Sequence, residues 1–211
     1  AGAPPDDFSV NGQNWMFPTY NWDAMEKDNF IWWKNRFRKL SDYFDCFRID
    51  HILGFFRIWE VPMDYVQGLC GHFNPALPFT EEEIEQYGLI FNEARLTTPH
   101  INREFLPELF GEQVEMVIGT YLAQSSSNHF VLKPFCDTQR KIEALFAGKT
   151  DEGSIRIKEG LFAIANEVLF LRDSRNPDKF HPRISANQSY LYRELSTTDR
   201  YAFDQLYWHF F

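Results

Sequence analysis

The sequence predicts an α/β fold, in which a helix and a short strand are followed by a mainly helical segment. Between Asn29 and Tyr43, basic residues alternate with apolar ones spaced i, i+4, i+7 and i+11, a pattern typical of an amphipathic helix: Trp33, Phe37, Leu40 and Phe44. A short apolar run from Cys46 to Asp50 follows and predicts a strand. From about residue 65, helical signals dominate.

The remaining elements follow in chain order. Leu53 to Trp59 fits either a second strand or a turn of helix, and Pro62 closes it. A capping box at Thr80–Glu83 opens a short helix that Gly88 ends. Three more helices are expected at 114–123, 138–146 and 154–165, then a brief strand at 168–171 and a helix from 197 to 211.

Charge and cysteine content exclude several classes of function. A net charge of -9 provides no basic field for phosphates or anionic lipids, so we expect neither nucleic acid nor a membrane surface as partner. Three cysteines, odd in number and widely spaced, argue against a disulfide framework or a zinc cage and favour a reducing, cytoplasmic location. No apolar run approaches the ~20 residues of a membrane span, and the first residues lack the basic-then-apolar pattern of a signal peptide.

Other chemistries have little support. The six histidines show no metal-ligand spacing, and no glycine-rich phosphate loop opens a helix, so neither a metal nor an organic cofactor is expected. Aromatic residues, in contrast, make up 18% of the chain. Because the apolar faces of sugars stack on aromatic rings, this content fits a carbohydrate site, and it fits a Phe-rich core equally well.

The two ends of the sequence suggest a piece of a longer protein. The first residue is not Met, and the opening Ala1–Pro5 is a loop signal. The last residues, from Leu206 to Phe211, carry no helix stop signal. We therefore expect the chain to stop inside an element.

The residues that could carry chemistry follow the predicted strand at 46–50. Arg48, Asp50 and His51 form a charged cluster where the strand ends, and active sites of β/α barrels lie at that end of their strands. A carboxylate there is well placed for catalysis. Asp50 could equally cap the next turn or pair with Arg48.

Six sequence segments resemble those of glycoside hydrolase family 77, the amylomaltase and disproportionating-enzyme group. Four lie near the N-terminus: GAPPDDFSVNGQNW at 2–15, PTYNW at 18–22, FIWWKNRF at 30–37 and FRIDHILGFFRIWEVP at 47–62. Two more, GLCGHFNPALPFTEEEIEQYG at 68–88 and KFHPRI at 179–184, resemble the maltose-using type with a long insertion after the nucleophile strand.

The resemblance implies a fragment of a (β/α)8 TIM barrel. Residues 1–64 would form a barrel segment, 65–195 a mainly helical insertion, and 196–211 a truncated helix leading back to the barrel. An open partial barrel leaves strand edges and apolar faces uncovered, so the isolated chain is expected to self-associate.

The resemblance also assigns roles to residues. Asp50 matches the family's nucleophile and Arg48 the arginine that orients it, which suits retaining glycosyl transfer because a guanidinium favours an ionised carboxylate. Four further residues become substrate-contact candidates: Asp6, Gln13, Trp15 and His51, the last with a structural role nearly as plausible. Trp59 could stack on sugar or pack in the core. Met16 stands where the family usually has Gly.

The implied activity is 4-α-glucanotransferase, acting on maltose, maltooligosaccharides or soluble α-glucan. The family's acid/base Glu lies in a Gly-Glu-Asp-Leu-Gly motif that these residues lack, while Glu60 and Asp64 follow Asp50 too closely to replace it. The fragment alone is therefore expected to be inactive, with the acid/base beyond residue 211. Hydrolysis of the α-amylase type and non-catalytic glucan binding are the alternatives.

Overall fold

A computed structural model describes all residues from 1 to 211. The N-terminal sheet has the strand order β2-β1-β3-β4, all antiparallel. Its strands are short: β1 (Gly2–Ala3), β2 (Gln13–Asn14), β3 (Ile58–Glu60) and β4 (His72–Asn74). Glycine is required at Gly2, because a Cβ there would lie 2.0 Å from the Gln13 carbonyl oxygen.

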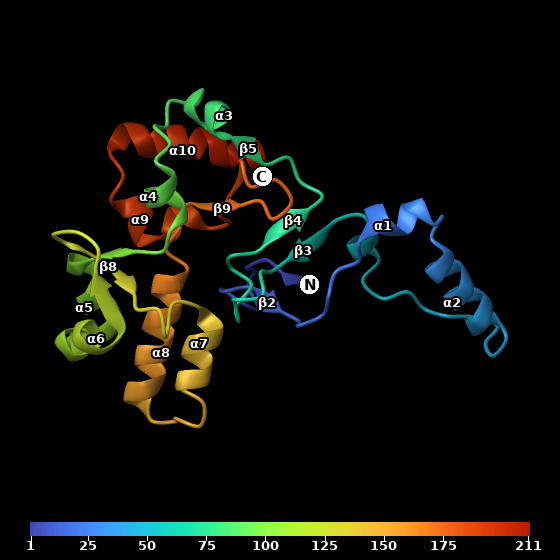
Figure 1. Cartoon of the computed structure of the whole chain (residues 1–211), viewed down its shortest axis with the longest axis horizontal. Coiled ribbons are helices and arrows are strands. Elements are labelled where there is room, and N and C mark those ends of the chain that lie inside the picture. The colour runs from blue at the N-terminus through green and yellow to red at the C-terminus, as the bar shows by residue number, and fades with distance from the viewer.

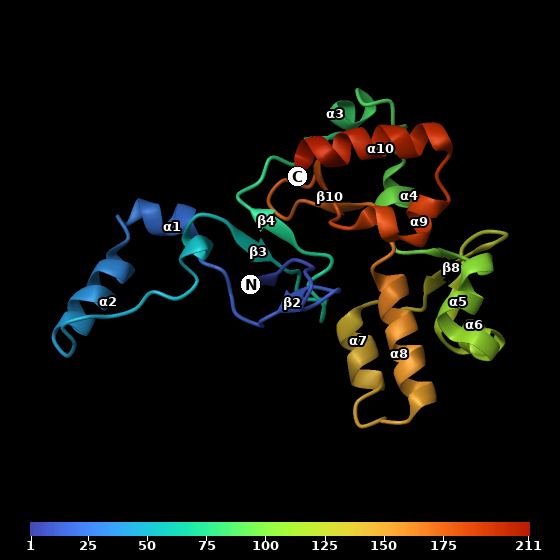
Figure 2. The same ribbon diagram turned by 180° about the vertical axis from the view of Figure 1, so that it is seen from behind.

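An arm of two helices leaves this sheet and extends away from the rest of the molecule in both Figure 1 and Figure 2. It comprises α1 (Trp22–Lys27) and α2 (Ile31–Ser41), and the 3₁₀ turn η1 (Ile52–Phe55) leads back to β3. Neither α1 nor α2 has a buried residue. The predicted amphipathic helix is confirmed as α2, and the apolar residues Trp33, Phe37 and Leu40 of its predicted face are half-buried.

The strand predicted at Cys46–Asp50 is wrong. This segment has no regular structure, and its backbone makes no hydrogen bond to other backbone groups. A strand persists only where a neighbouring strand pairs with it, and none lies beside this run. The segment at 53–59, for which the sequence allowed either a strand or a turn of helix, contains both: η1 lies at its start and β3 at its end.

The chain beyond β4 combines helices with two antiparallel three-stranded sheets, β5-β10-β9 and β6-β8-β7. The first contains β5 (Phe79–Thr80), β9 (Phe170–Arg172) and β10 (Lys179–Pro182). The second contains β6 (Ile101–Asn102), β7 (Leu122–Gln124) and β8 (His129–Leu132).

Eight α-helices follow β4 and accompany these two sheets. The helices are α3 (Glu81–Glu85), α4 (Glu93–Thr97), α5 (Leu106–Phe110), α6 (Val114–Tyr121), α7 (Gln139–Leu145), α8 (Glu152–Ala165), α9 (Tyr190–Arg193) and α10 (Thr197–Phe210). Three 3₁₀ turns complete them: η2 (Arg103–Phe105), η3 (Gly111–Gln113) and η4 (Ala186–Gln188). None of the helices combines the length and apolar character needed to cross a membrane.

Two hydrophobic cores hold this region together. One contains 16 buried residues, including Leu106, Phe110 and Leu161, and forms where α5 and α7 pack on α8 and α8 packs on β8. The other contains 13, including Phe170 and Phe203, and lies under α10. Nearly the whole buried core thus lies beyond residue 80, while the arm stays exposed.

Local sequence signals located six of the ten α-helices, α2 among them, and missed α1, α4, α5 and α9. The capping box at Thr80 and Glu83 is formed, and the expected helices at 114–123, 138–146, 154–165 and 197–211 appear as α6, α7, α8 and α10. Helices and sheets are mixed, which confirms the α/β class. All strand pairs are antiparallel. The barrel arrangement remains a prediction.

Candidate active site

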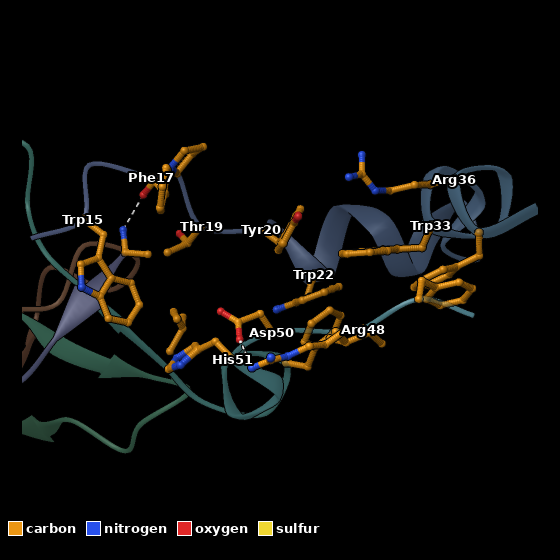
Figure 3. Close-up of a pocket in the computed structure, with 18 of the residues that line it drawn as sticks. Trp15, Phe17, Thr19, Tyr20, Trp22, Trp33, Arg36, Arg48, Asp50 and His51 are labelled. Atoms are coloured by element: carbon orange, nitrogen blue, oxygen red, sulfur yellow. Dashed lines mark hydrogen bonds and ion pairs between the residues drawn. The ribbon is translucent and has the colours of Figure 1, made fainter. Parts of the chain in front are cut away.

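A cavity of about 630 Å³ lies between the N-terminal loop, the α1–α2 arm and the segment that returns to β3. Figure 3 shows it, with Asp50 and His51 on one side and aromatic rings along its length. Twelve of its 19 lining residues are hydrophobic. Its volume and largely apolar wall are typical of ligand sites.

The arm places a group of aromatic rings in this cavity. The side chain of Asn21 caps α1 by accepting a hydrogen bond from Ala24 N, and a left-handed Phe30, at φ 55°, turns the chain into α2. This turn brings Trp33 over Trp22, with ring planes 16° apart and centroids 6.4 Å apart. Tyr20 adds a third ring, 5.2 Å from Trp33.

Asp50 and Arg48 lie together at the cavity wall. Arg48 Nη2 donates to Asp50 Oδ1 at 3.2 Å. Their side chains are 87% and 86% exposed, so the contact adds little to stability and leaves the carboxylate open to a ligand. A left-handed His51, at φ 49°, begins the turn of η1 directly after Asp50. Thus an accessible carboxylate and a guanidinium face an aromatic wall.

Trp15 joins this group from the N-terminal loop. Its ring meets His51 edge-on with centroids 5.2 Å apart, and its indole N–H donates to Gln13 Oε1 at 2.9 Å. Gln13 therefore contacts a lining residue, Trp15, without lining the cavity. Met16, where the family usually has Gly, has φ 62°, in the left-handed region that glycine favours.

Two predicted substrate contacts lie elsewhere. Asp6 Oδ1 accepts hydrogen bonds from Phe8 N at 3.0 Å and Ser9 N at 2.8 Å, which closes a turn away from the cavity. Trp59 is 2% exposed and donates its indole N–H to the Gly68 carbonyl at 2.9 Å. Its ring packs edge-on against Phe73. Trp59 therefore packs in the core, and no face of its ring is open to a ligand.

The arm rings were not singled out as site residues from the sequence. Trp33 and Phe37 were assigned to the apolar face of a helix, and Tyr20 and Trp22 were quoted only within a motif. The available signal was the density of aromatics in PTYNW and FIWWKNRF. Asp50 is the one carboxylate among the lining residues, and the chain contains no group of three or more His, Cys, Asp or Glu suited to a metal ion.

An aromatic wall around an accessible carboxylate is typical of carbohydrate-binding sites, because rings stack on sugar faces while charged groups bind hydroxyls. Residues 1–195 match the model of glycoside hydrolase family 77, described as 4-alpha-glucanotransferase. The chain belongs to this family.

Relatives carry the same description. The chain is 37% identical over 215 residues to the 4-alpha-glucanotransferase DPE2 of Oryza sativa subsp. japonica, covering 100% of this chain and 23% of the rice protein. Identity is 42% over 92 residues to the chloroplastic/amyloplastic 4-alpha-glucanotransferase of Solanum tuberosum, covering 43% of this chain and 16% of that protein. Identity is 52% over 62 residues to the 4-alpha-glucanotransferase of Streptococcus pneumoniae serotype 4, covering 29% of this chain and 12% of that protein.

The chain thus spans between 12% and 23% of the length of these relatives. No solved structure matches it.

Proposed function

We propose that the whole protein is a 4-α-glucanotransferase in which Asp50 is the nucleophile. The observation that carries this proposal is the placement of an accessible Asp50 beside Arg48 in the aromatic cavity. Family membership supports the same reaction. The substrates would be maltose, maltooligosaccharides or soluble α-glucan, with glucosyl rings stacked on Trp22 and Trp15.

In the proposed reaction, Asp50 attacks the anomeric carbon of the donor sugar. The bond from that carbon to the leaving 4-oxygen breaks, and an acid/base carboxyl group gives the leaving oxygen a proton. The 4-hydroxyl of an acceptor glucan then attacks the same carbon, returns its proton to the acid/base and releases Asp50. Arg48 acts as a positioning residue for the carboxylate.

The second carboxyl group must lie about 5 Å from the first in a retaining mechanism. Since Asp50 is the only carboxylate lining the cavity, we propose that a Glu outside these 211 residues supplies it. The same part of the protein would complete a (β/α)8 barrel around the arm. Three free thiols, Cys46, Cys70 and Cys136, are compatible with the cytoplasmic location that we propose.

The test is chromatography of products from the full-length protein incubated with maltose and with a longer maltooligosaccharide. Glucans both longer and shorter than the substrate, at constant reducing-end count, are expected. Asp50→Asn should abolish them, whereas Asp45→Asn, an exposed carboxylate outside the cavity, should not. A rising reducing-end count would indicate hydrolysis, and transfer that survives Asp50→Asn would refute the nucleophile assignment.

A further inference from the structure

A second cavity, of about 280 Å³, lies behind the same N-terminal loop. Its floor is made by the end of α8 and the segment between β10 and α9, and residues Val10 and Asn11 form one edge. Two charged residues in its wall are almost completely buried, Glu167 at 5% exposed and Arg183 at 2%. The third buried polar residue of the wall, Asn166, already uses its side-chain amide in hydrogen bonds with Gln67, Gln139 and Cys70. Charged side chains are seldom buried to this degree.

Glu167 and Arg183 are held in fixed positions. Glu167 Oε2 accepts a hydrogen bond from Leu191 N, at the start of α9, at 3.0 Å. Arg183 donates from Nε to Val168 O at 2.8 Å and from Nη1 to Ile184 O at 3.0 Å, which leaves Nη2 without a protein acceptor.

The two charges do not neutralise each other by direct contact. Glu167 and Arg183 form no ion pair within 4 Å, although both line the cavity. Burial raises the pKa of Glu167, and the Leu191 N–H and the Arg183 charge only partly oppose this. Because burying charged groups without a direct partner is costly, the arrangement favours a ligand that bridges a fixed donor and a fixed acceptor.

The rim adds further polar groups. Asn11 and Gln188 line the cavity, and neither side chain forms a hydrogen bond with the protein. Ser185, also in the wall, has φ 56°, a left-handed conformation that is uncommon for a residue other than glycine. Strained backbone of this kind is concentrated at functional sites.

This combination selects a class of ligand. Amide groups and a guanidinium offer donors, while Glu167 and the amide oxygens offer acceptors. The carboxylate disfavours an anion, and the guanidinium disfavours a cation. A neutral ligand with several hydroxyl groups satisfies both, and the volume accommodates one hexose ring.

We propose that this cavity is a second glucan-binding site, which takes one glucosyl unit of a maltooligosaccharide and is separate from the Asp50 cavity. The choice of sugar rests on the proposed function; the site itself rests on the buried Glu167 and Arg183. Asn11 and Trp15 lie close to the two ends of β2, so a sugar bound here contacts the segment that also lines the Asp50 cavity.

The test is a titration with maltose, followed by NMR, of the ¹⁵N-labelled 211-residue chain carrying Leu53→Ser/Phe56→Ser, two exposed positions outside both cavities whose substitution limits self-association. The side-chain amides of Asn11 and Gln188 report on the second cavity, and the indole N–H groups of Trp15 and Trp22 report on the Asp50 cavity. Shifts of the two amides are expected. The double variant Asn11→Ala/Gln188→Ala should weaken this binding about tenfold, as measured by the Leu191 amide. Asn187→Ala, an exposed neighbour that does not line the cavity, should leave it unchanged.

The NMR signals thus report binding in each cavity separately. Amide shifts without indole shifts would support the second site even if the proposed function fails, and indole shifts without amide shifts would overturn the second site while leaving the proposed function intact. Unchanged affinity in the double variant would also overturn it, as would binding of phosphate in place of maltose.

Discussion

His72 lies parallel to His181, with ring centroids 4.2 Å apart and planes 12° from parallel. His72 belongs to β4 of the N-terminal sheet and His181 to β10, so this stack joins two sheets. His181 is 1% exposed, and its Nε2 lies 2.8 Å from Asp173 Oδ2. Burial, reinforced by His72, lowers the pKa of His181, although Asp173 acts in the opposite direction.

This lowered pKa predicts an acid-sensitive fold. The unfolded chain binds a proton at His181 near its ordinary pKa of 6.5, whereas the folded chain does so only at lower pH. The contribution of uncharged His181 to the free energy of unfolding is therefore fully present above pH 6.5 and is lost as the pH falls from there through the folded-state pKa. Burial alone would raise the pKa of Asp173, but hydrogen bonds from His181 and nearby amides outweigh burial and lower it. A further part of the stability is therefore lost at lower pH, below the ordinary Asp pKa of 3.8. The free energy of unfolding, measured with urea at pH 8.0, 6.5 and 5.5, should decline as the pH falls, and His181→Gln should make this decline smaller. An equal decline in both proteins would contradict the role of His181.

Gln139 is expected to be a key residue of the interior. It is 0% exposed, and its Oε1 accepts hydrogen bonds from Val66 N and Gln67 N, both at 2.9 Å. Gln139→Ala leaves these amide groups without an acceptor and should cost about 3 kcal/mol. Urea unfolding measures the loss, with Glu143→Ala on the exposed side of the same helix as the control, expected within about 0.5 kcal/mol of the original chain. Equal effects of both changes would disprove this role.

Two helical glycines should respond oppositely to alanine. A Cβ at Gly160 in α8 would lie 2.3 Å from Phe110 Cε1, so Gly160→Ala should destabilise the chain by about 1–3 kcal/mol. At Gly119 in α6 a Cβ would meet nothing within 4 Å, and Gly119→Ala should stabilise by up to about 1 kcal/mol. Thermal melting distinguishes the two, and a tolerated Gly160→Ala would show that Phe110 can move.

Arg48 should matter for activity and not for stability. Because the Arg48–Asp50 contact is largely exposed, Arg48→Ala should leave the melting temperature unchanged. In the full-length protein it should lower kcat at least tenfold while changing KM little, since in the proposed reaction Arg48 orients the nucleophile and does not bind the sugar. Arg48→Lys should recover part of the rate. A loss confined to KM would assign Arg48 to substrate binding instead.

The 211-residue chain should self-associate through the arm and the segment after Asp50. Large apolar side chains there are open to solvent, among them Trp32 at 45%, Leu53 at 69% and Phe56 at 72%. Sedimentation velocity at two concentrations should show oligomers that Leu53→Ser/Phe56→Ser reduces. Leu77→Ser, at a position 88% exposed but far from the arm in sequence, serves as the control. A compact monomer at both concentrations would contradict the prediction.

The sequence was informative where the signal is local. Asp151 and Thr138 cap α8 and α7 through their own side chains, and such contacts span only three residues. Strands of two to four residues carry too little periodicity to be recognised, which is why β5, β6 and β7 were not predicted. The run at 46–50 shows the opposite error, because apolar composition alone does not supply a strand partner.

The sequence by itself determined the positions of six helices, α2, α3, α6, α7, α8 and α10. It also determined the Arg48-Ile49-Asp50-His51 motif and the resemblance that the family match confirms. Only the tertiary structure decided that Trp59 is buried, that Trp22 and Trp33 line the cavity with Asp50, and that Glu167 and Arg183 face a second one. The reason is physical: a cap or a helical period depends on residues three or four apart. Burial and cavities depend on which distant segments pack together, and no local pattern records that.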